Sequence, residues 1–472
     1  MPVRYSYSNL TYALVTILLV VLFLCMFRSI SRTDYRKYRQ SVTDKTISNR
    51  LEKLVNDLGI ENEQSKPVIA VAVFNSRTIR YGFYGRVQNG NLVDEDTLFF
   101  APNMAKPVTS VALLNLLYEI DVPIKRRVEK FYKEYKPEGY DELFGKRMTF
   151  SGLLSNTSGL NKGTSKGFKY PPFPSSNNFP KENKLLATLN GICKIKFSNK
   201  CTFYSIPPVK LINKPFTKVQ ESSHGYALLG YIIENLTNTA YEDYIKKEIF
   251  DQLKMIRTTS NIPWYNENWE YQTKKEFSAE LMNELRTGNV ALGNEGDRLD
   301  DLYLTKGWRR YPNTAVHMTT TLKDYVNFLL TCQQGVSRIT ETPVKNNPLL
   351  PTFEPYKTRG EQLISKAAAF NMVSNPEIPV KGDSETGHFG SRTVVDGVLT
   401  AFSQKGSVPG YSCSFYMSPG SQKIENPDNY NTRLGPGDFG YLVMTNIGTY
   451  HEKINNDLLS SIHDTVIPFL NK

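Results

Sequence analysis

Cysteine and histidine are the residues whose spacing could bind a metal or form a disulfide, and the chain has five of each. Neither a CxxC pair nor an HExxH helix occurs and the histidines are scattered, so the sequence predicts no metal site and no cofactor. Only Cys193 and Cys201 are spaced to close a short loop, either as a disulfide in an oxidising compartment or as two free thiols. Cys332 and Cys413 lie in apolar surroundings and are expected to be buried thiols.

Six segments indicate serine chemistry through a resemblance to one enzyme family. The segment TLFFAPNMAKPVTSVALLNLL (97–117) is similar to the one that carries the S-x-x-K motif of class C serine β-lactamases and penicillin-binding proteins. MTFSGLLSNTSGL (148–160) resembles the "LLxHTSGL" block that follows it. Four further segments follow in the family's order. Residues 221–237 resemble the block "YSNxGYxLLGxIIE", and 241–259 resemble the element that ends in "PLGMxxT". Residues 317–329 resemble "STAxDLAxF", and 402–419 resemble "HxG…PGY". The resemblance covers about 67–450 and implies an α+β fold of the β-lactamase/transpeptidase type, with a central antiparallel sheet flanked by helices and a helical subdomain.

The family's chemistry needs a serine at the start of a helix, and a lysine one turn later or a tyrosine of the Y-x-N loop takes its proton. In this sequence the nucleophile position is Asn103, although Lys106 is kept. The resemblance implies backbone N–H donors to an oxyanion at Asn103 and Ser407. The other two motif positions are also changed: they read Glu221-Ser222-Ser223 for Y-x-N and Gln404-Lys405-Gly406 for H-x-G, so only the glycine remains.

Other residues could in principle replace the missing serine. No serine in the chain stands three residues before a lysine. Ser110 lies two turns along the helix and is expected to be buried, so Ser222 is the rescue candidate, with Glu221 as a possible general base. Lys106 is expected to donate to Asn103 or to pair with Glu221, because an unpaired buried cation is costly. His224 could line the cleft, but a position at the surface or behind the cleft is expected for it.

The N-terminal part of the sequence is apolar. Residues 10–27, LTYALVTILLVVLFLCMF, carry no charge; as a helix they are about 27 Å long, enough for a thin bilayer core. No small-residue cleavage site follows, so an uncleaved anchor is favoured over a signal peptide. The basic residues after it place the large part in the cytosol, whereas glycosylation triplets at Asn156 and Asn235 point to the other side. The sequence therefore predicts a single-pass membrane protein but leaves its orientation and compartment open.

Composition excludes several classes of protein. The chain has 472 residues, of which 40% are hydrophobic, and a formal net charge of +11. This is globular composition and excludes a disordered tail, a collagen-like repeat and a disulfide miniprotein. A basic balance attracts anionic partners, but no Lys/Arg run with interleaved aromatic residues is present, so nucleic-acid binding is not expected.

The hydrophobic pattern places strands near both ends of the chain. VIAVAVF (68–74) predicts a buried strand and TIRYGFYG (78–85) its hairpin partner. KPVTSVALLNLLYEI (106–120) is apolar nearly all round, as a helix buried on most sides should be. Further strands are predicted at 400–404, 412–417 and 440–446, and a last helix at about 451–470. Strands so far apart predict a sheet assembled from distant parts of the sequence, with helices between them.

The predicted layout has four parts: a tail (1–9), a transmembrane anchor (10–27), a basic stalk that merges into the first helix (28–65), and a β-lactamase-related domain (66–472) with a helical subdomain at about 150–330. The expected function is that of a pseudoenzyme that binds a small ligand in the residual cleft, self-associates or holds a protein partner at the membrane. The alternative is an active serine-type hydrolase, esterase or peptidase-like enzyme with a non-standard nucleophile such as Ser222. A third hypothesis is that the basic stalk recruits anionic lipid.

Overall fold

The computed structural model describes the chain in segments: 40–59, 67–75, 78–87, 90–132, 147–162, 184–190, 192–197, 200–206, 208–260, 289–291, 314–316, 318–340, 363–374, 384–395, 398–408, 410–419, 433–434 and 439–447. The predicted anchor at 10–27 and the predicted helix at 451–470 lie outside these residues. Within them, no helix is both long and apolar enough to cross a membrane.

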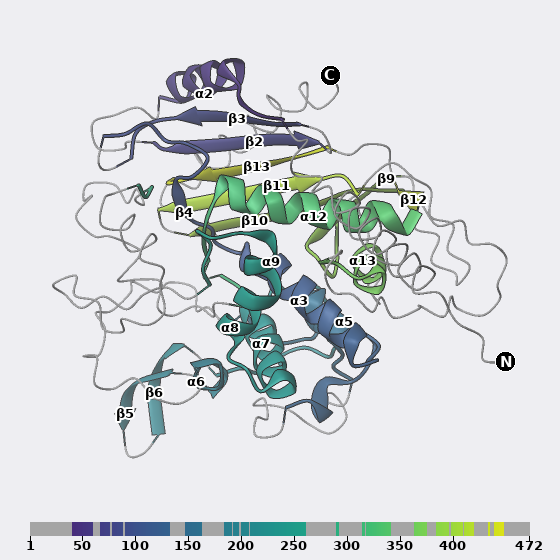
Figure 1. The fold of residues 1–472 in the computed structure, drawn as a ribbon. Coiled ribbons are helices and arrows are strands. Elements are labelled where there is room, and N and C mark those ends of the chain that lie inside the picture. The colour runs from purple at the N-terminus through teal and green to yellow at the C-terminus, as the bar shows by residue number, and fades with distance from the viewer. Residues whose placement is uncertain are drawn as a thin grey trace, which may run out of the picture.

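A nine-stranded sheet forms the centre of the fold (Figure 1), in the order β1-β3-β2-β13-β11-β10-β9-β8 with β12 beside β10. Its strands are β1 (Gln40–Thr43), β2 (Ile69–Asn75), β3 (Thr78–Tyr84), β8 (Ser384–Thr386), β9 (Ser391–Val395), β10 (Val398–Val408), β11 (Tyr411–Met417), β12 (Arg433–Leu434) and β13 (Phe439–Thr445). β2 pairs antiparallel with β13, with Ile69 opposite Thr445. The predicted strands and their assembly from distant parts of the chain are thereby confirmed.

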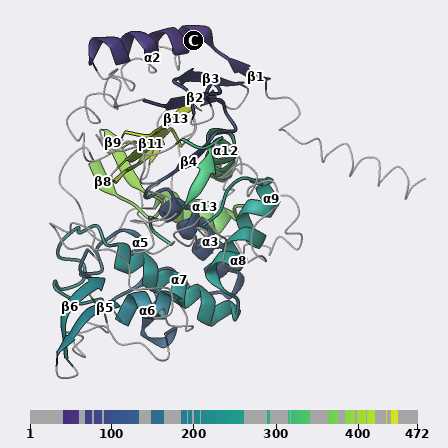
Figure 2. The ribbon, with the colours of Figure 1, turned by 90° about the vertical axis from the view of Figure 1, so that its left-hand side faces the viewer.

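Helices cover both faces of the sheet (Figures 1 and 2). Helix α2 (Lys45–Asp57) lies over one face, and α12 (Leu322–Thr340) crosses the other. α2 begins at Asp44, whose side chain caps it by accepting from the Thr46 N–H. Ile47, Leu51 and Val55 of α2 are buried against the sheet. The folded unit therefore includes α2, which precedes the predicted boundary at residue 66.

Helix α3 (Ala105–Glu119) is buried nearly all round, as predicted, with 12 of its 15 residues inside. Helices α7, α8 and α13 pack against it. The remaining helical elements of this layer include one 3-10 turn, η2, and one π-helical turn, η4: η2 (Val128–Lys130), α5 (Phe150–Leu154), α6 (Lys184–Asn190), α7 (Ser223–Thr237), α8 (Tyr241–Ile245), η4 (Lys246–Phe250), α9 (Asp251–Leu253) and α13 (Lys366–Val373).

Two predictions about the strands were wrong. The sheet is mixed, because β1 runs parallel to β3 and β12 parallel to β10; a parallel pair needs a crossover, and α2 with β2 lies between β1 and β3. The predicted helical subdomain also contains the hairpin of β5 (Ile192–Phe197) and β6 (Lys200–Ile206) and the strand β7 (Thr319–Thr321), which pairs with β4 (Leu98–Phe100). The alternation in ICKIKF is typical of a strand.

The cysteines divide into two groups. Cys332 and Cys413 are buried free thiols, as predicted. The hairpin register sets Cys193 opposite Tyr204 and Cys201 opposite Lys196, and a disulfide between Cys193 and Cys201 stays a prediction.

Candidate functional site

The turn that leads into α3 is fixed by two neighbouring elements. The Ala101 N–H donates to the Met318 carbonyl at 2.8 Å, and the Tyr325 hydroxyl donates to the Met104 carbonyl at 3.0 Å. Between them Asn103 has φ +64°, a left-handed conformation that asparagine tolerates better than most residues. The Asn103 side chain is thus held at one place at the start of the buried helix.

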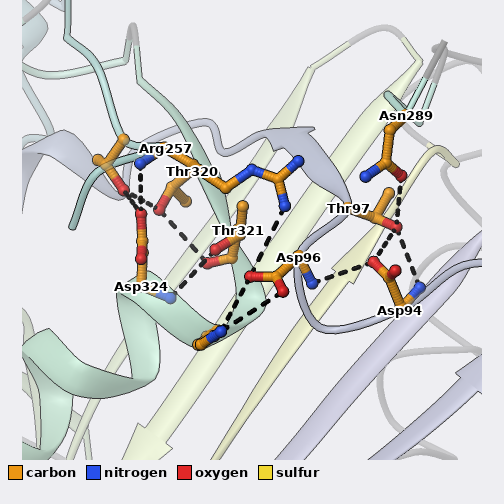
Figure 3. A network of polar contacts seen from close by, with 10 residues as sticks. Asp94, Asp96, Thr97, Arg257, Asn289, Thr320, Thr321 and Asp324 are labelled. Carbon is orange, nitrogen blue, oxygen red and sulfur yellow. Dashed lines mark hydrogen bonds and ion pairs between the residues drawn. The ribbon is translucent and has the colours of Figure 1, made fainter. Parts of the chain in front are cut away.

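A polar network fixes the two short strands next to this turn (Figure 3). Asp324, in the first turn of α12, accepts from the Thr258 hydroxyl at 2.9 Å and from the Arg257 N–H at 3.0 Å. Burial raises the pKa of Asp324 to about 6. The Arg257 guanidinium also lies 3.6 Å from a carboxylate oxygen of Asp96, just before β4. These contacts tie residues 257–258 to α12 and to the segment before β4, and β4 itself pairs with β7, so together they hold the turn that β4 enters.

Strand β10 touches the same turn at Gly406. A Cβ atom on Gly406 would lie 1.7 Å from the Pro102 carbonyl oxygen. The Cys413 thiol on β11 donates to that oxygen at 3.0 Å. Only glycine allows so close an approach of the two main chains. Asn103 directly follows Pro102, and Ser407 directly follows Gly406, so this contact also sets the positions of these two residues.

Lys106 is buried and paired with Glu221. The Lys106 side chain is 3% exposed, and its Nζ donates to Oε1 of Glu221, whose side chain is 58% exposed. The same Nζ lies 5.7 Å from the centre of the Tyr226 ring. The charge of Lys106 holds the pKa of Glu221 below its ordinary value, while burial opposes this shift. Of the two partners considered for Lys106, Asn103 and Glu221, the structure pairs it with Glu221.

Two side-chain amides meet at one carbonyl of β10. Asn103 Nδ2 donates to the Lys405 carbonyl at 3.2 Å, and Gln404 Nε2 donates to it at 3.0 Å. Asn103 Nδ2 also lies 3.4 Å from Glu221 Oε1. The structure therefore brings together residues from α3, β10 and the loop before α7. This site offers a charge pair and amide donors, and a carboxamide is no nucleophile for acyl transfer.

Ser222 is the N-cap of α7. Its Oγ accepts from the Gly225 N–H at 3.0 Å and donates to the Asn161 carbonyl at 2.6 Å, and the residue is 1% exposed. Its own N–H donates to Asn156 Oδ1 at 3.2 Å. The Ser222 hydroxyl proton thus goes to a main-chain carbonyl and not to a base. Ser223 is buried in the first turn of α7.

The other predicted residues lie around this centre. Lys405 and Ser407 are exposed on β10, and Ser407 Oγ lies 2.8 Å from Ser412 Oγ. Ser110 is buried, as predicted, and donates to the Lys106 carbonyl at 2.9 Å. His224 is buried behind the site with Nδ1 at 2.8 Å from Asn161 Oδ1, so the surface position also considered for it is wrong. Burial lowers the pKa of His224 to about 4.

Sequence reasoning missed a second polar cluster. Ser151 on α5 and His388 between β8 and β9 are both buried, with Oγ and Nε2 2.9 Å apart. Thr386 of β8 donates to the Ser155 carbonyl at 2.6 Å. These contacts fasten the β8–β9 hairpin to α5. Ser151 lies in the 148–160 segment but outside the part that matches the "LLxHTSGL" block, and His388 stands in none of the six segments, so the sequence carried no signal for this cluster.

The chain is similar to known proteins in sequence and in fold. A family model described as Beta-lactamase matches residues 43–449. A putative D-alanyl-D-alanine carboxypeptidase of Salmonella agona (strain SL483) is 25% identical over 175 residues, which are 36% of this chain and 35% of the carboxypeptidase. The chain thus matches about a third of that protein's length.

Solved structures resemble the fold over most of the chain. The octameric penicillin-binding protein homologue from Pyrococcus abyssi has a TM-score of 0.55 at 17% identity, covering 89% of this chain and 77% of that one. A penicillin-binding protein from Bacillus halodurans has a TM-score of 0.54 at 14% identity, covering 88% and 99%. At these identities the likeness supports the fold alone.

Proposed function

Because the chain belongs to the beta-lactamase family, we propose that it is a member that has given up acyl transfer and uses the same site for a non-covalent role. That role is to bind either a small ligand or a protein partner, and the partner can be a second copy of the chain. The observation that carries the proposal is the state of the turn before α3. By the resemblance of 97–117 to the S-x-x-K segment, Asn103 takes the family's nucleophile position; in the structure its amide donates to the Lys405 carbonyl.

The lysine at this site supports the same proposal. Acyl transfer needs a group that accepts the nucleophile's proton. Lys106 instead donates to the Glu221 carboxylate, so its amine is already engaged by an acceptor. Glu221 itself is a poor base, because Lys106 lowers its pKa.

The test is active-site labelling of the full-length protein with a fluorophosphonate and with a fluorescent penicillin. We expect no covalent label on the native protein. Labelling of the native protein at one mapped serine would overturn the proposal and make that serine the nucleophile. If that serine were Ser222, labelling would be lost in Ser222→Ala and kept in Ser223→Ala, the matched neighbour.

We further propose that residues 10–27 hold the protein in a membrane as a single-pass anchor, on the strength of their uncharged apolar sequence. After an alkaline wash of the membranes, the protein that lacks residues 2–27 should be in the soluble fraction, whereas the full-length protein should stay in the membrane fraction. If the full-length chain is itself extracted by alkaline carbonate, it has no membrane-spanning anchor.

A further inference from the structure

Glu221 is a counter-charge that rotation of its own side chain can remove from Lys106. The main chain on both sides is held, because the Gln220 N–H donates to the Asn156 carbonyl at 2.8 Å and the Ser222 N–H donates to Asn156 Oδ1 at 3.2 Å. The Glu221 side chain is nevertheless 58% exposed, whereas that of Lys106 is 3% exposed. The carboxylate can therefore swing into solvent while the loop and the cation stay in place.

Several groups that remain after such a rotation favour an anion. Lys106 Nζ and Asn103 Nδ2 converge on one carboxylate oxygen of Glu221. The first turn of α3, which carries Lys106, has no acidic residue, so the positive end of the helix dipole adds to the lysine charge. The charge of Lys162 also acts on Glu221. A buried ammonium left without a counter-ion is strongly unfavourable.

We infer that Lys106 and Asn103 form a carboxylate-binding site that Glu221 fills in the free protein, and that a small ligand carboxylate binds there by displacing the Glu221 side chain. The inference rests on the proposed non-covalent function. It assigns the ligand class from the group that already occupies the site: both donors address one carboxylate oxygen, with the Tyr226 ring 5.7 Å from the ammonium. Binding exchanges one charged contact for another, so it needs no new charge to be buried.

The experiment is a thermal-shift titration of the full-length protein with sodium acetate, against sodium chloride and sodium phosphate at matched ionic strength and pH 7. The Glu221→Ala variant vacates the site, and Glu221→Asp draws the carboxylate back by one methylene if the alanine variant does not fold. Glu52→Ala is the control, because Glu52 is an exposed glutamate on α2, far from α3. We expect saturable stabilisation by acetate, with an apparent Kd at least tenfold lower in the Glu221 variant than in the wild type and in Glu52→Ala.

The cation must carry the effect. In Lys106→Met combined with Glu221→Ala, the acetate response should fall to that of chloride. A folded Glu221 variant that responds equally to acetate and chloride overturns the inference, and so does a response that persists without Lys106. Equal responses to acetate and phosphate would show a general anion site and overturn the assignment to carboxylates. None of these results depends on covalent labelling, so this inference can fail while the proposed loss of acyl transfer stands.

Discussion

Ser151 and His388 are 237 positions apart in the chain and share a hydrogen bond of 2.9 Å between Oγ and Nε2. His388 Nδ1 lies 2.8 Å from the Asn371 carbonyl, which can only accept, so Nδ1 carries the proton and Nε2 accepts from Ser151. Burial lowers the pKa of His388 to about 4. The neutral ring thus ties the β8–β9 hairpin to both α5 and α13.

The Ser151–His388 pair predicts that acid lowers the stability of the folded protein, through protonation of His388. A histidine whose folded pKa is about 4 contributes stability that is present above its ordinary pKa of 6.5 and is lost as the pH falls toward 4. The loss amounts to about 3 kcal/mol, at ~1.4 kcal/mol per pKa unit. Asp324 acts in the opposite sense, because its raised pKa of about 6 makes the folded state more stable as the pH falls from above 6 toward 3.8. Urea unfolding at a series of pH values from 7 to 4 measures how the free energy of unfolding changes with pH.

The two groups can be separated by substitution. In His388→Gln the free energy of unfolding should fall less steeply between pH 6.5 and 4 than in the wild type. In Asp324→Asn it should fall more steeply. An unchanged slope in His388→Gln would show that His388 does not titrate differently in the folded and unfolded states.

Glu221→Gln should lower the free energy of unfolding by about 1–3 kcal/mol, because it leaves Lys106 buried without its counter-charge. The loss is smaller than for a fully buried pair, since Glu221 is more than half exposed. Lys106→Met in the same chain should recover at least half of it, because the cation is then gone. Chemical denaturation of the wild type, both single variants and the double variant measures both effects. Additive losses would mean that the two residues are not coupled.

Asn103→Ser should react with a fluorophosphonate only slowly, although it places a hydroxyl at the start of α3. In this variant Lys106 remains paired with Glu221 and is not directed at the new hydroxyl. Asn103→Ser combined with Glu221→Tyr should label at least ten times faster, measured by mass spectrometry over time. Glu221→Tyr alone is the control and should not label. Equal rates in the single and double variants would remove Glu221 as a block on Lys106.

Gly406→Ala should destabilise the protein by about 2–4 kcal/mol, because its Cβ would overlap the Pro102 carbonyl oxygen. Gly225→Ala on α7 is the matched control: its nearest neighbour, Leu153 Cδ2, would lie at 3.6 Å, an ordinary contact. It should change stability by less than about 1 kcal/mol. Thermal denaturation of both variants is sufficient, and similar melting temperatures would show that β10 can move away from the turn.

The sheet and the buried helix were predictable because their patterns are strong and local. VIAVAVF and the mostly apolar run before Glu119 fit one structure each. The parallel placement of β1 was not predictable, since four polar-rich residues carry no sign of the strand that they will join. The β5–β6 hairpin was missed although ICKIKF alternates, because the surrounding segment was interpreted as helical.

The site was predictable in its members but not in its bonding. The resemblance brought Asn103, Glu221 and Gln404 together. The cost of a buried cation predicted a partner for Lys106 but left Asn103 and Glu221 as alternatives. That Ser222 serves as a helix cap required the coordinates, because a serine next to a predicted cleft looks the same in sequence whether it caps or reacts. The Ser151–His388 contact depends on tertiary packing alone.

The pairing of β2 with β13 has a consequence for the order in which the protein folds. β2 is made early and β13 late, with Asn75 facing Phe439 across the ladder. During synthesis, before β13 is made, the edge of β2 that pairs with β13 is open. The β2–β3 hairpin also exposes apolar side chains, because α2 covers only one of its two faces. Contacts of such long sequence separation are slow to form and leave intermediates open to aggregation. A chain that stops before residue 439 would keep that edge permanently, so premature termination there should yield a protein that depends on chaperones.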